Sequence, residues 1–232
     1  MSEASLAPPP GAGAATFLLT VRGRAKAAST EEARITHNST AGNPAGVAAA
    51  RSLGDLSHQV FSGYGDAQAG EVLFIDFWNS LPGLAQFFSD PQVLAGADLL
   101  FSSRDAPVWA ATSGFGGFHL TIPSGKAVTG VGLIRVSVGS MDKAADAFTA
   151  YTAATISASR RHGIVAHSVW SRVPNPGEES AREVLGVDLW MDAAEMSGYY
   201  ELGLGFDALG PVFAAEPDTS VWQSAPGDWT EW

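Results

Sequence analysis

Two histidines and an asparagine in the first half of the chain have the side-chain types that proton-transfer chemistry needs. His37 and Asn38 are adjacent, and His58 follows them further along the chain. A neutral imidazole accepts a proton near neutral pH, and a carboxamide donates hydrogen bonds to an anion. We therefore take His37 or His58 as the candidate base, and Asn38 as the candidate donor, of a site that deprotonates an acidic substrate.

The segment around His37 interrupts a helical pattern. Residues 36–40 are polar, and the sequence Gly42-Asn43-Pro44 then ends the helix. The corresponding residues 142–161 of the second half keep an uninterrupted helical spacing of apolar side chains. Polar groups that face a sheet cost stability unless they are hydrogen-bonded, so the interruption indicates a functional role. A frayed, solvated helix end is the alternative.

The two halves of the chain repeat one another. Residues 71–78 (EVLFIDFW) align with residues 183–190 (EVLGVDLW), and residues 54–61 align with residues 163–170. The second alignment places His58 on His167. A structural role repeated by duplication is therefore an alternative explanation for both histidines.

Each copy has the element order of a single small fold. In the first copy, strands are predicted over residues 16–21, 58–61 and 72–77, and over 99–103 with 108–109; helices are predicted from a capping box at 29–32 and over 81–88 and 90–97. This β-α-β-β-α-β order is typical of the ferredoxin-like split unit. Its sheet leaves one face bare, so we expect an α+β fold in which two tandem units pack sheet to sheet as an intramolecular α+β barrel.

The domain boundaries follow from this repeat. We expect a disordered tail over 1–14, an N-terminal unit over 15–111, a Gly-rich linker over 112–130, a C-terminal unit over 131–226 and a tail over 227–232. The C-terminal tail over 227–232 is aromatic and acidic. It either packs back on the barrel or mediates assembly.

Composition restricts the partners and the chemistry. The 232 residues include 13 Lys and Arg against 24 Asp and Glu, a net charge of -11, so we expect no nucleic-acid partner. The chain has no cysteine, which excludes disulfides, thiolate metal sites and cysteine nucleophiles. No basic leader or long apolar run is visible, so we expect a cytoplasmic protein without a membrane partner. The expected partner is a small hydrophobic or aromatic molecule, and a homodimer is left open.

Two stretches of the first copy carry a family resemblance. Residues 76–80 (DFWNS) and 84–91 (LAQFFSDP) resemble the antibiotic biosynthesis monooxygenase-like branch of the dimeric α+β barrel superfamily, and the resemblance covers nearly the whole chain as two tandem units. It implies a pocket in each unit between the sheet and its helices, with Trp78 among the lining residues. The haem-degrading branch has a histidine on the following helix where this chain has Phe88, so haem ligation is not expected there.

The resemblance and the residues together predict a cofactor-independent monooxygenase-like enzyme that oxidises a small aromatic or quinol-type substrate in the N-terminal unit. The expected catalytic residues are His37, Asn38 and His58, and the expected substrate-binding residues are Trp78, Phe88, Arg104 and Trp109. No cofactor and no metal are expected. One alternative is a non-catalytic ligand-binding or scaffold protein of the same fold. Another is a metal-dependent lyase or isomerase that uses His37, His58 and a carboxylate such as Glu32.

Overall fold

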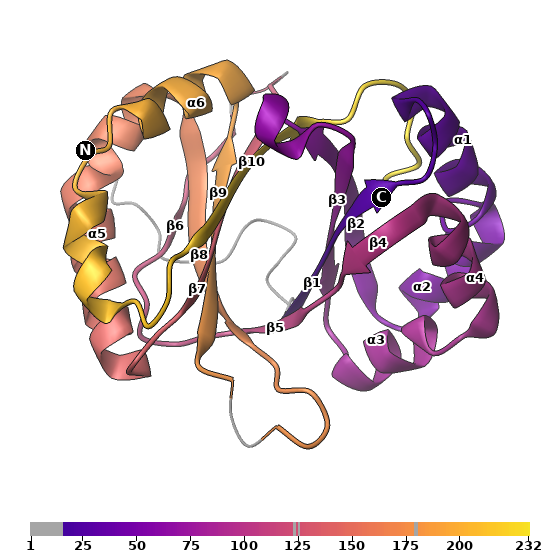
Figure 1. Cartoon of the computed structure of the whole chain (residues 1–232), viewed down its shortest axis with the longest axis horizontal. Coiled ribbons are helices and arrows are strands. Elements are labelled where there is room, and N and C mark those ends of the chain that lie inside the picture. The colour runs from indigo at the N-terminus through magenta and orange to yellow at the C-terminus, as the bar shows by residue number, and fades with distance from the viewer. Residues whose placement is uncertain (1–15, 123, 125, 179–180) are drawn as a thin grey trace. The chain divides into compact units, whose positions relative to one another are not determined.

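The computed structural model describes residues 16–122, 124, 126–178 and 181–232, so the expected disordered tail over 1–14 lies outside the described residues. The chain divides into two compact units (Figure 1). The first unit comprises residues 16–108 and Ser224–Trp232, and the second comprises Trp109–Gln223. None of the helices in the described ranges is long and apolar enough to cross a membrane.

The first unit is an antiparallel sheet with helices on one face (Figure 1). Its elements are β1 (Phe17–Ala25), α1 (Thr30–Ser39), α2 (Pro44–Ser52), β2 (Asp55–Gly63), η1 (Asp66–Gln68), β3 (Glu71–Trp78), α3 (Leu81–Phe88), α4 (Pro91–Leu100) and β4 (Phe101–Asp105). The strands pair in the order β2-β3-β1-β4. Each helical step of the β-α-β-β-α-β order is therefore made of two short helices.

Local sequence explains why α1 and α2 are separate helices. Ser29 caps α1 by accepting a hydrogen bond from the backbone N–H of Glu32 at 3.2 Å. Asn43 caps α2 in the same way, and Pro44 occupies its first turn, where no N–H is required. The break at Gly42 leaves the end of α1, with His37 and Asn38, on the helix-covered face of the sheet.

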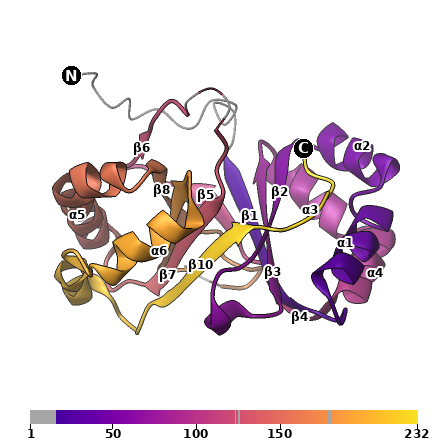
Figure 2. The ribbon, with the colours of Figure 1, turned by 90° about the horizontal axis from the view of Figure 1, so that it is seen from above.

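The second unit has one long helix where the first unit has α1 and α2. Its elements are β5 (Val108–Ala111), β6 (Phe118–His119), β7 (Gly130–Ser137), α5 (Met141–Arg161), β8 (Ile164–Arg172), β9 (Glu183–Trp190), α6 (Ala193–Glu201), η2 (Phe206–Val212) and β10 (Asp218–Ser224). The strands pair antiparallel in the order β8-β9-β7-β10, and Figure 2 shows α5 and α6 of this unit from above.

Three expected boundaries differ in the structure. β5, which was expected to close the first unit, begins at Val108, the last residue of that unit's main segment, and its residues Trp109–Ala111 pair with β8 of the second unit. The expected linker over 112–130 contains β6, which also pairs with β8. The expected tail over 227–232 is part of the first unit. Local strand propensity predicts β5 but cannot say which sheet it joins, because pairing partners are set by tertiary contacts.

Each unit has its own apolar core between its sheet and its helices. The first core includes Val60, Phe74, Trp78, Phe87 and Trp229. The second core includes Val136, Phe148, Val169, Val184 and Leu209. Val60 and Val169 lie two residues after His58 and His167 on their strands, so both histidines face the helices of their own unit.

Candidate functional site: two related histidine–aspartate pairs

Each unit buries one histidine–aspartate pair at the same place in its sheet. His58 Nδ1 lies 2.5 Å from Asp76 Oδ1, and His167 Nδ1 lies 2.6 Å from Asp188 Oδ1. In both units the two residues are direct partners across neighbouring antiparallel strands. Strand register therefore puts the imidazole and the carboxylate on the same face within hydrogen-bond reach.

In the first unit a second histidine extends the pair. His37 Nε2 lies 3.1 Å from His58 Nε2, and the two rings are stacked with 6° between their planes. The other ring nitrogen of His37 lies 2.9 Å from Asn38 Oδ1. The structure thus brings together the three residues that the sequence predicted as catalytic.

The hydrogen-bond partners show which ring nitrogens of His37 and His58 act as donors. Asn38 Oδ1 accepts a hydrogen bond from the backbone N–H of Thr230 at 2.9 Å, and Asn38 Nδ2 donates to the carbonyl of Asp228 at 2.8 Å. Oδ1 is therefore an acceptor, so His37 must donate to it through Nδ1 and accept from His58 through Nε2. His58 then donates through Nε2 to His37, and its Nδ1 is hydrogen-bonded to Asp76.

The protonation of His37 agrees with this arrangement. Burial, followed by the positive charge of His58, lowers the pKa of His37 to about 4, against a smaller opposing effect of the hydrogen bond to Asn38. His37 is fully buried and His58 is 4% exposed. His37 is therefore neutral at physiological pH.

The end of the chain covers these histidines. The indole of Trp232 stacks on the His58 ring with centroids 4.5 Å apart, and the ring of Trp229 lies 5.3 Å from that of His37. Main-chain hydrogen bonds run both ways between Trp232 and His58, at 2.7 and 3.2 Å. Figures 1 and 2 both show the chain ending beside α1 and β2. All four ring nitrogens of His37 and His58 are thus engaged, and none is left to act on a substrate.

The predicted substrate-binding residues do not gather around these histidines as a set. Trp78 and Phe88 pack together with ring centroids 6.1 Å apart, and Trp78 is fully buried. Arg104 instead forms a 2.7 Å ion pair with Asp98. Trp109 belongs to the second unit, where the guanidinium carbon of Arg135 lies 5.6 Å from its ring centre. Trp78 and Phe88 are core residues of the first unit, and Arg104 and Trp109 lie outside the histidine cluster.

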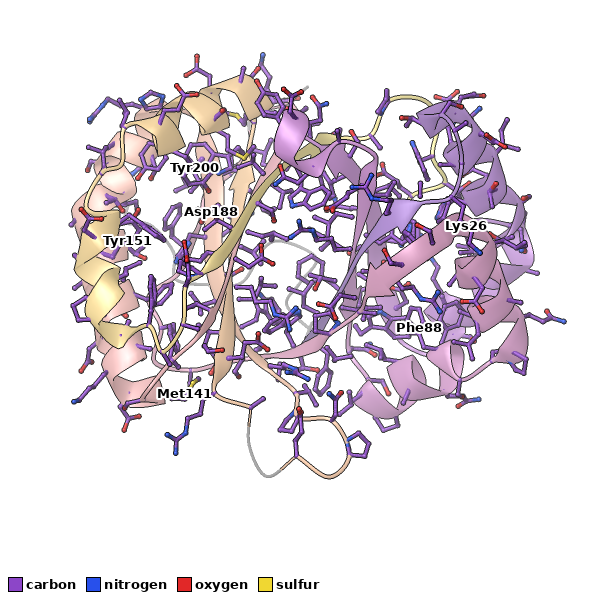
Figure 3. All side chains as sticks on the ribbon, in the orientation of Figure 1. Lys26, Phe88, Met141, Tyr151, Asp188 and Tyr200 are labelled. Atoms are coloured by element: carbon purple, nitrogen blue, oxygen red, sulfur yellow. The ribbon has the colours of Figure 1, made fainter. Side chains whose placement is uncertain are left out.

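The second unit joins its pair to a tyrosine. Tyr200 donates its hydroxyl hydrogen to Asp188 Oδ2 at 2.6 Å, and Trp190 Nε1 donates to that hydroxyl oxygen at 3.3 Å. Figure 3 shows Tyr200 next to Asp188 and Tyr151 further away, on α5. A carboxylate accepts hydrogen bonds only, so His167 donates to Asp188 through Nδ1. In neutral His167 the free lone pair is then on Nε2.

This Nε2 atom is the distinctive feature of the second unit. It is buried and has no hydrogen-bond partner among the residues that the structure describes. The site still reaches solvent, because 10% of the His167 side chain and 21% of the Asp188 side chain are exposed. A fixed Nδ1–H and an unused Nε2 are the arrangement of an oriented general base.

Two sequence differences between the units explain why their histidine–aspartate pairs have different partners. Gly132 lies across the sheet from Asp188, and a Cβ atom at Gly132 would clash with the hydroxyl of Tyr200. In the first unit Leu19 lies across from Asp76. The helix that follows carries Phe88 at the place that corresponds to Tyr200. Because Phe88 has no hydroxyl, Trp78 Nε1 has no hydrogen-bond partner within the described residues.

Two more tyrosines, Tyr151 and Tyr199, interact electrostatically with Asp188, as Tyr200 does. Burial, followed by the negative charge of Asp188, raises the pKa of Tyr200 well above its ordinary value. Burial also raises the pKa of Tyr151, whose hydroxyl is hydrogen-bonded to Tyr199. Burial raises the pKa of Tyr199 as well, so all three hydroxyls stay protonated at physiological pH.

Sequence reasoning did not assign a site to the second unit. The signal that could have found it lies in the alignment of the two halves, where the polar residues His167, Asp188 and Tyr200 stand at three aligned positions and the first half has Phe88 at the third. For the metal-dependent alternative, no group of three or more His, Cys, Asp or Glu side chains in the described part of the chain is arranged to hold a metal ion.

No protein-family model matches the chain, and no curated protein matches it by sequence. Solved structures do match its fold. An anthrone oxidase-like protein is 14% identical, with a TM-score of 0.60 over 91% of this chain and 94% of that one. A protein of Lactobacillus acidophilus NCFM, provisionally assigned as a monooxygenase, is 8% identical, with a TM-score of 0.55 over 93% and 97%. A chlorite dismutase variant of Candidatus Nitrospira defluvii is 12% identical, with a TM-score of 0.53 over 91% and 92%. The chain therefore shares its mixed α+β fold with these proteins.

Proposed function

We propose that the chain is an antibiotic biosynthesis monooxygenase-like enzyme, built as a tandem duplication of a ferredoxin-like unit. It oxidises a small aromatic or quinol-type substrate with molecular oxygen and without a bound cofactor. The observation that carries the proposal is the unpartnered Nε2 of His167, whose ring is oriented by Asp188. The fold shared with solved proteins described as oxidases and monooxygenases supports the reaction class.

The reaction begins with removal of an acidic substrate proton by His167 Nε2. Asp188 stabilises the imidazolium that forms, and Tyr200 keeps the second carboxylate oxygen engaged through its hydroxyl. The resulting carbanion or phenolate is electron-rich enough to reduce oxygen directly.

The chemistry balances for anthrone, which we choose as a probe because a solved neighbour is described as anthrone oxidase-like. His167 removes one C10 proton to give the anthranolate anion. The anion transfers one electron to O₂, and the two radicals combine into a C10 peroxide that takes up a proton. Loss of the second C10 proton with cleavage of the O–O bond gives anthraquinone and water. One anthrone and one O₂ thus give one anthraquinone and one H₂O.

The proposal places the reaction in the second unit, although the sequence favoured the first. In the first unit every ring nitrogen of His37 and His58 is engaged, and Trp229 and Trp232 lie over the rings. A base in that state has no lone pair available to a substrate. We infer that the first unit contributes no base to the oxidation.

Substrate-dependent oxygen uptake tests the proposal. The unaltered chain should consume oxygen with anthrone or a quinol faster than protein-free buffer does, and His167→Gln should return the rate to that of the buffer. His119→Gln is the matched control, because His119 is a half-exposed histidine of the same unit. Uptake no faster than buffer for any member of a panel of anthrones, naphthols and quinols would overturn the proposal. Full activity of His167→Gln would overturn the assignment of the base.

A further inference from the structure

The indole of Trp232 is held in the first unit by more than apolar packing. Its ring lies on the His58 imidazole with 20° between the two planes, and its Nε1 donates to Asp55 Oδ2 at 3.1 Å. The indole is half-buried against the apolar core of this unit. The indole therefore stacks on a flat ring, donates a hydrogen bond from its edge and packs against apolar side chains.

The chemistry of this slot is specific. The His58 ring is hydrogen-bonded at both nitrogens, to His37 and Asp76, and its face stacks against a flat, electron-rich ring. Asp55 is 5% exposed, and its Oδ1 accepts from the backbone N–H of Ser57 at 3.2 Å. Its Oδ2 faces the edge of the ring, so the slot favours a ring that has a donor hydrogen in its own plane.

The carboxyl group at this position is not required by the fold. Asp55 lies across the sheet from Trp78, and the corresponding residue of the second unit, across from Trp190, is the buried Ile164. Burying a carboxyl group is costly, and burial raises the pKa of Asp55 to about 8, with a further contribution from Asp76. An apolar residue would pack there without this cost, so Asp55 is explained by recognition of a donor.

We infer that the first unit contains a binding slot for an electron-rich bicyclic aromatic ligand with an in-plane N–H or O–H donor, and that the chain fills this slot with its own Trp232. The slot consists of the His58 ring face and the Asp55 carboxyl group. An external ligand enters when the last residues of the chain leave the slot. The inference is independent of the oxidation proposed for the second unit.

Binding of indole to full-length Trp232→Ala tests the inference by calorimetry. This variant should bind indole, while benzofuran, which has the same shape but no N–H, should bind at least about ten-fold more weakly. Adding Asp55→Leu should abolish the preference for indole. Equal binding of the two compounds by Trp232→Ala would show an unspecific cavity and contradict the inference, as would the absence of indole binding.

Hydrogen exchange in the unaltered chain gives a second test that needs no variant. The backbone N–H groups of Thr230 and Trp232 are hydrogen-bonded to Asn38 and His58, so they exchange slowly while Trp232 occupies the slot. Indole at millimolar concentration should speed their exchange, and benzofuran at the same concentration should not. Unchanged exchange with indole would show that no ligand competes with Trp232. These outcomes do not depend on oxygen uptake, so they separate this inference from the proposed function.

Discussion

Gly132 faces Asp188 directly across the β7–β9 pair, and the missing side chain at Gly132 is what lets Tyr200 reach the carboxylate. In the first unit the corresponding residue, Leu19, fills that space opposite Asp76. A histidine–aspartate pair common to both sheets thus acquires a tyrosine in one unit and a second histidine in the other.

Tyr200→Phe should destabilise the fold by about 1–3 kcal/mol, because it leaves Asp188 Oδ2 and Trp190 Nε1 without their partner. Urea unfolding monitored by tryptophan fluorescence measures the change. Tyr64→Phe, at a half-buried tyrosine of the first unit, is the control and should change stability by less than about 0.5 kcal/mol. A loss no larger than that of the control would contradict the hydrogen-bond network.

Leu19→Gly and Phe88→Tyr should be coupled, because together they recreate the Gly132 and Tyr200 arrangement in the first unit. Each single change should destabilise, the first by opening a cavity and the second by placing a hydroxyl against Leu19. The double variant should be at least about 0.5 kcal/mol more stable than the sum of the two effects predicts. A double-mutant cycle in urea measures the coupling, and strict additivity would show that the repeats are not equivalent here.

Acid should destabilise the first unit through His37. The pKa of His37 is about 4 in the folded chain against 6.5 for the free side chain, so the unfolded chain binds more protons between these values. Stability from this group is fully present above pH 6.5 and falls as the pH drops towards 4, by at most about 3 kcal/mol. His37→Gln should remove this contribution, so the stability of the unaltered chain relative to the variant should fall between pH 6.5 and 4 in a pH series of urea unfolding curves. An unchanged slope between pH 6.5 and 4 would contradict a neutral buried His37.

Asp55 should give the opposite pH dependence. Its pKa is about 8 in the folded chain against 3.8 for the free side chain, so the folded chain binds more protons over this range. Stability from this group is present at low pH and is lost as the pH rises towards 8, which opposes His37 below pH 6.5. Asp55→Asn should therefore flatten the decline between pH 6.5 and 8. The same loss of stability between pH 6.5 and 8 in Asp55→Asn would show that another group causes it.

The sequence predicted the local parts of the fold better than the long-range ones. The capping residue Ser29, the helix break at Gly42 and the strands around Phe74 and Leu185 follow from local propensity and periodicity. The return of Trp229 and Trp232 to the first unit depends on contacts with residues far apart in the chain, such as Asn38 and Asp55, which no local pattern encodes.

The candidate site was also predicted only in part, because it too depends on contacts between residues far apart in the chain. The meeting of His37, Asn38 and His58 was predicted from the polar run on α1, and the structure brings them together. Whether a ring nitrogen stays free depends on side chains that arrive from elsewhere. In the first unit His37 occupies Nε2 of His58 and Trp232 covers its ring, whereas Nε2 of His167 has no partner among the described residues.

Anaerobic mixing with anthrone tests the central claim, that His167 is the base, most directly. Without oxygen the reaction stops after proton removal, so the anthranolate anion accumulates and is followed by its absorbance in a stopped-flow spectrometer. The account predicts anion formation in the unaltered chain and in His119→Gln, and none above the protein-free level in His167→Gln. Equal anion formation in the unaltered chain and in His167→Gln would contradict it.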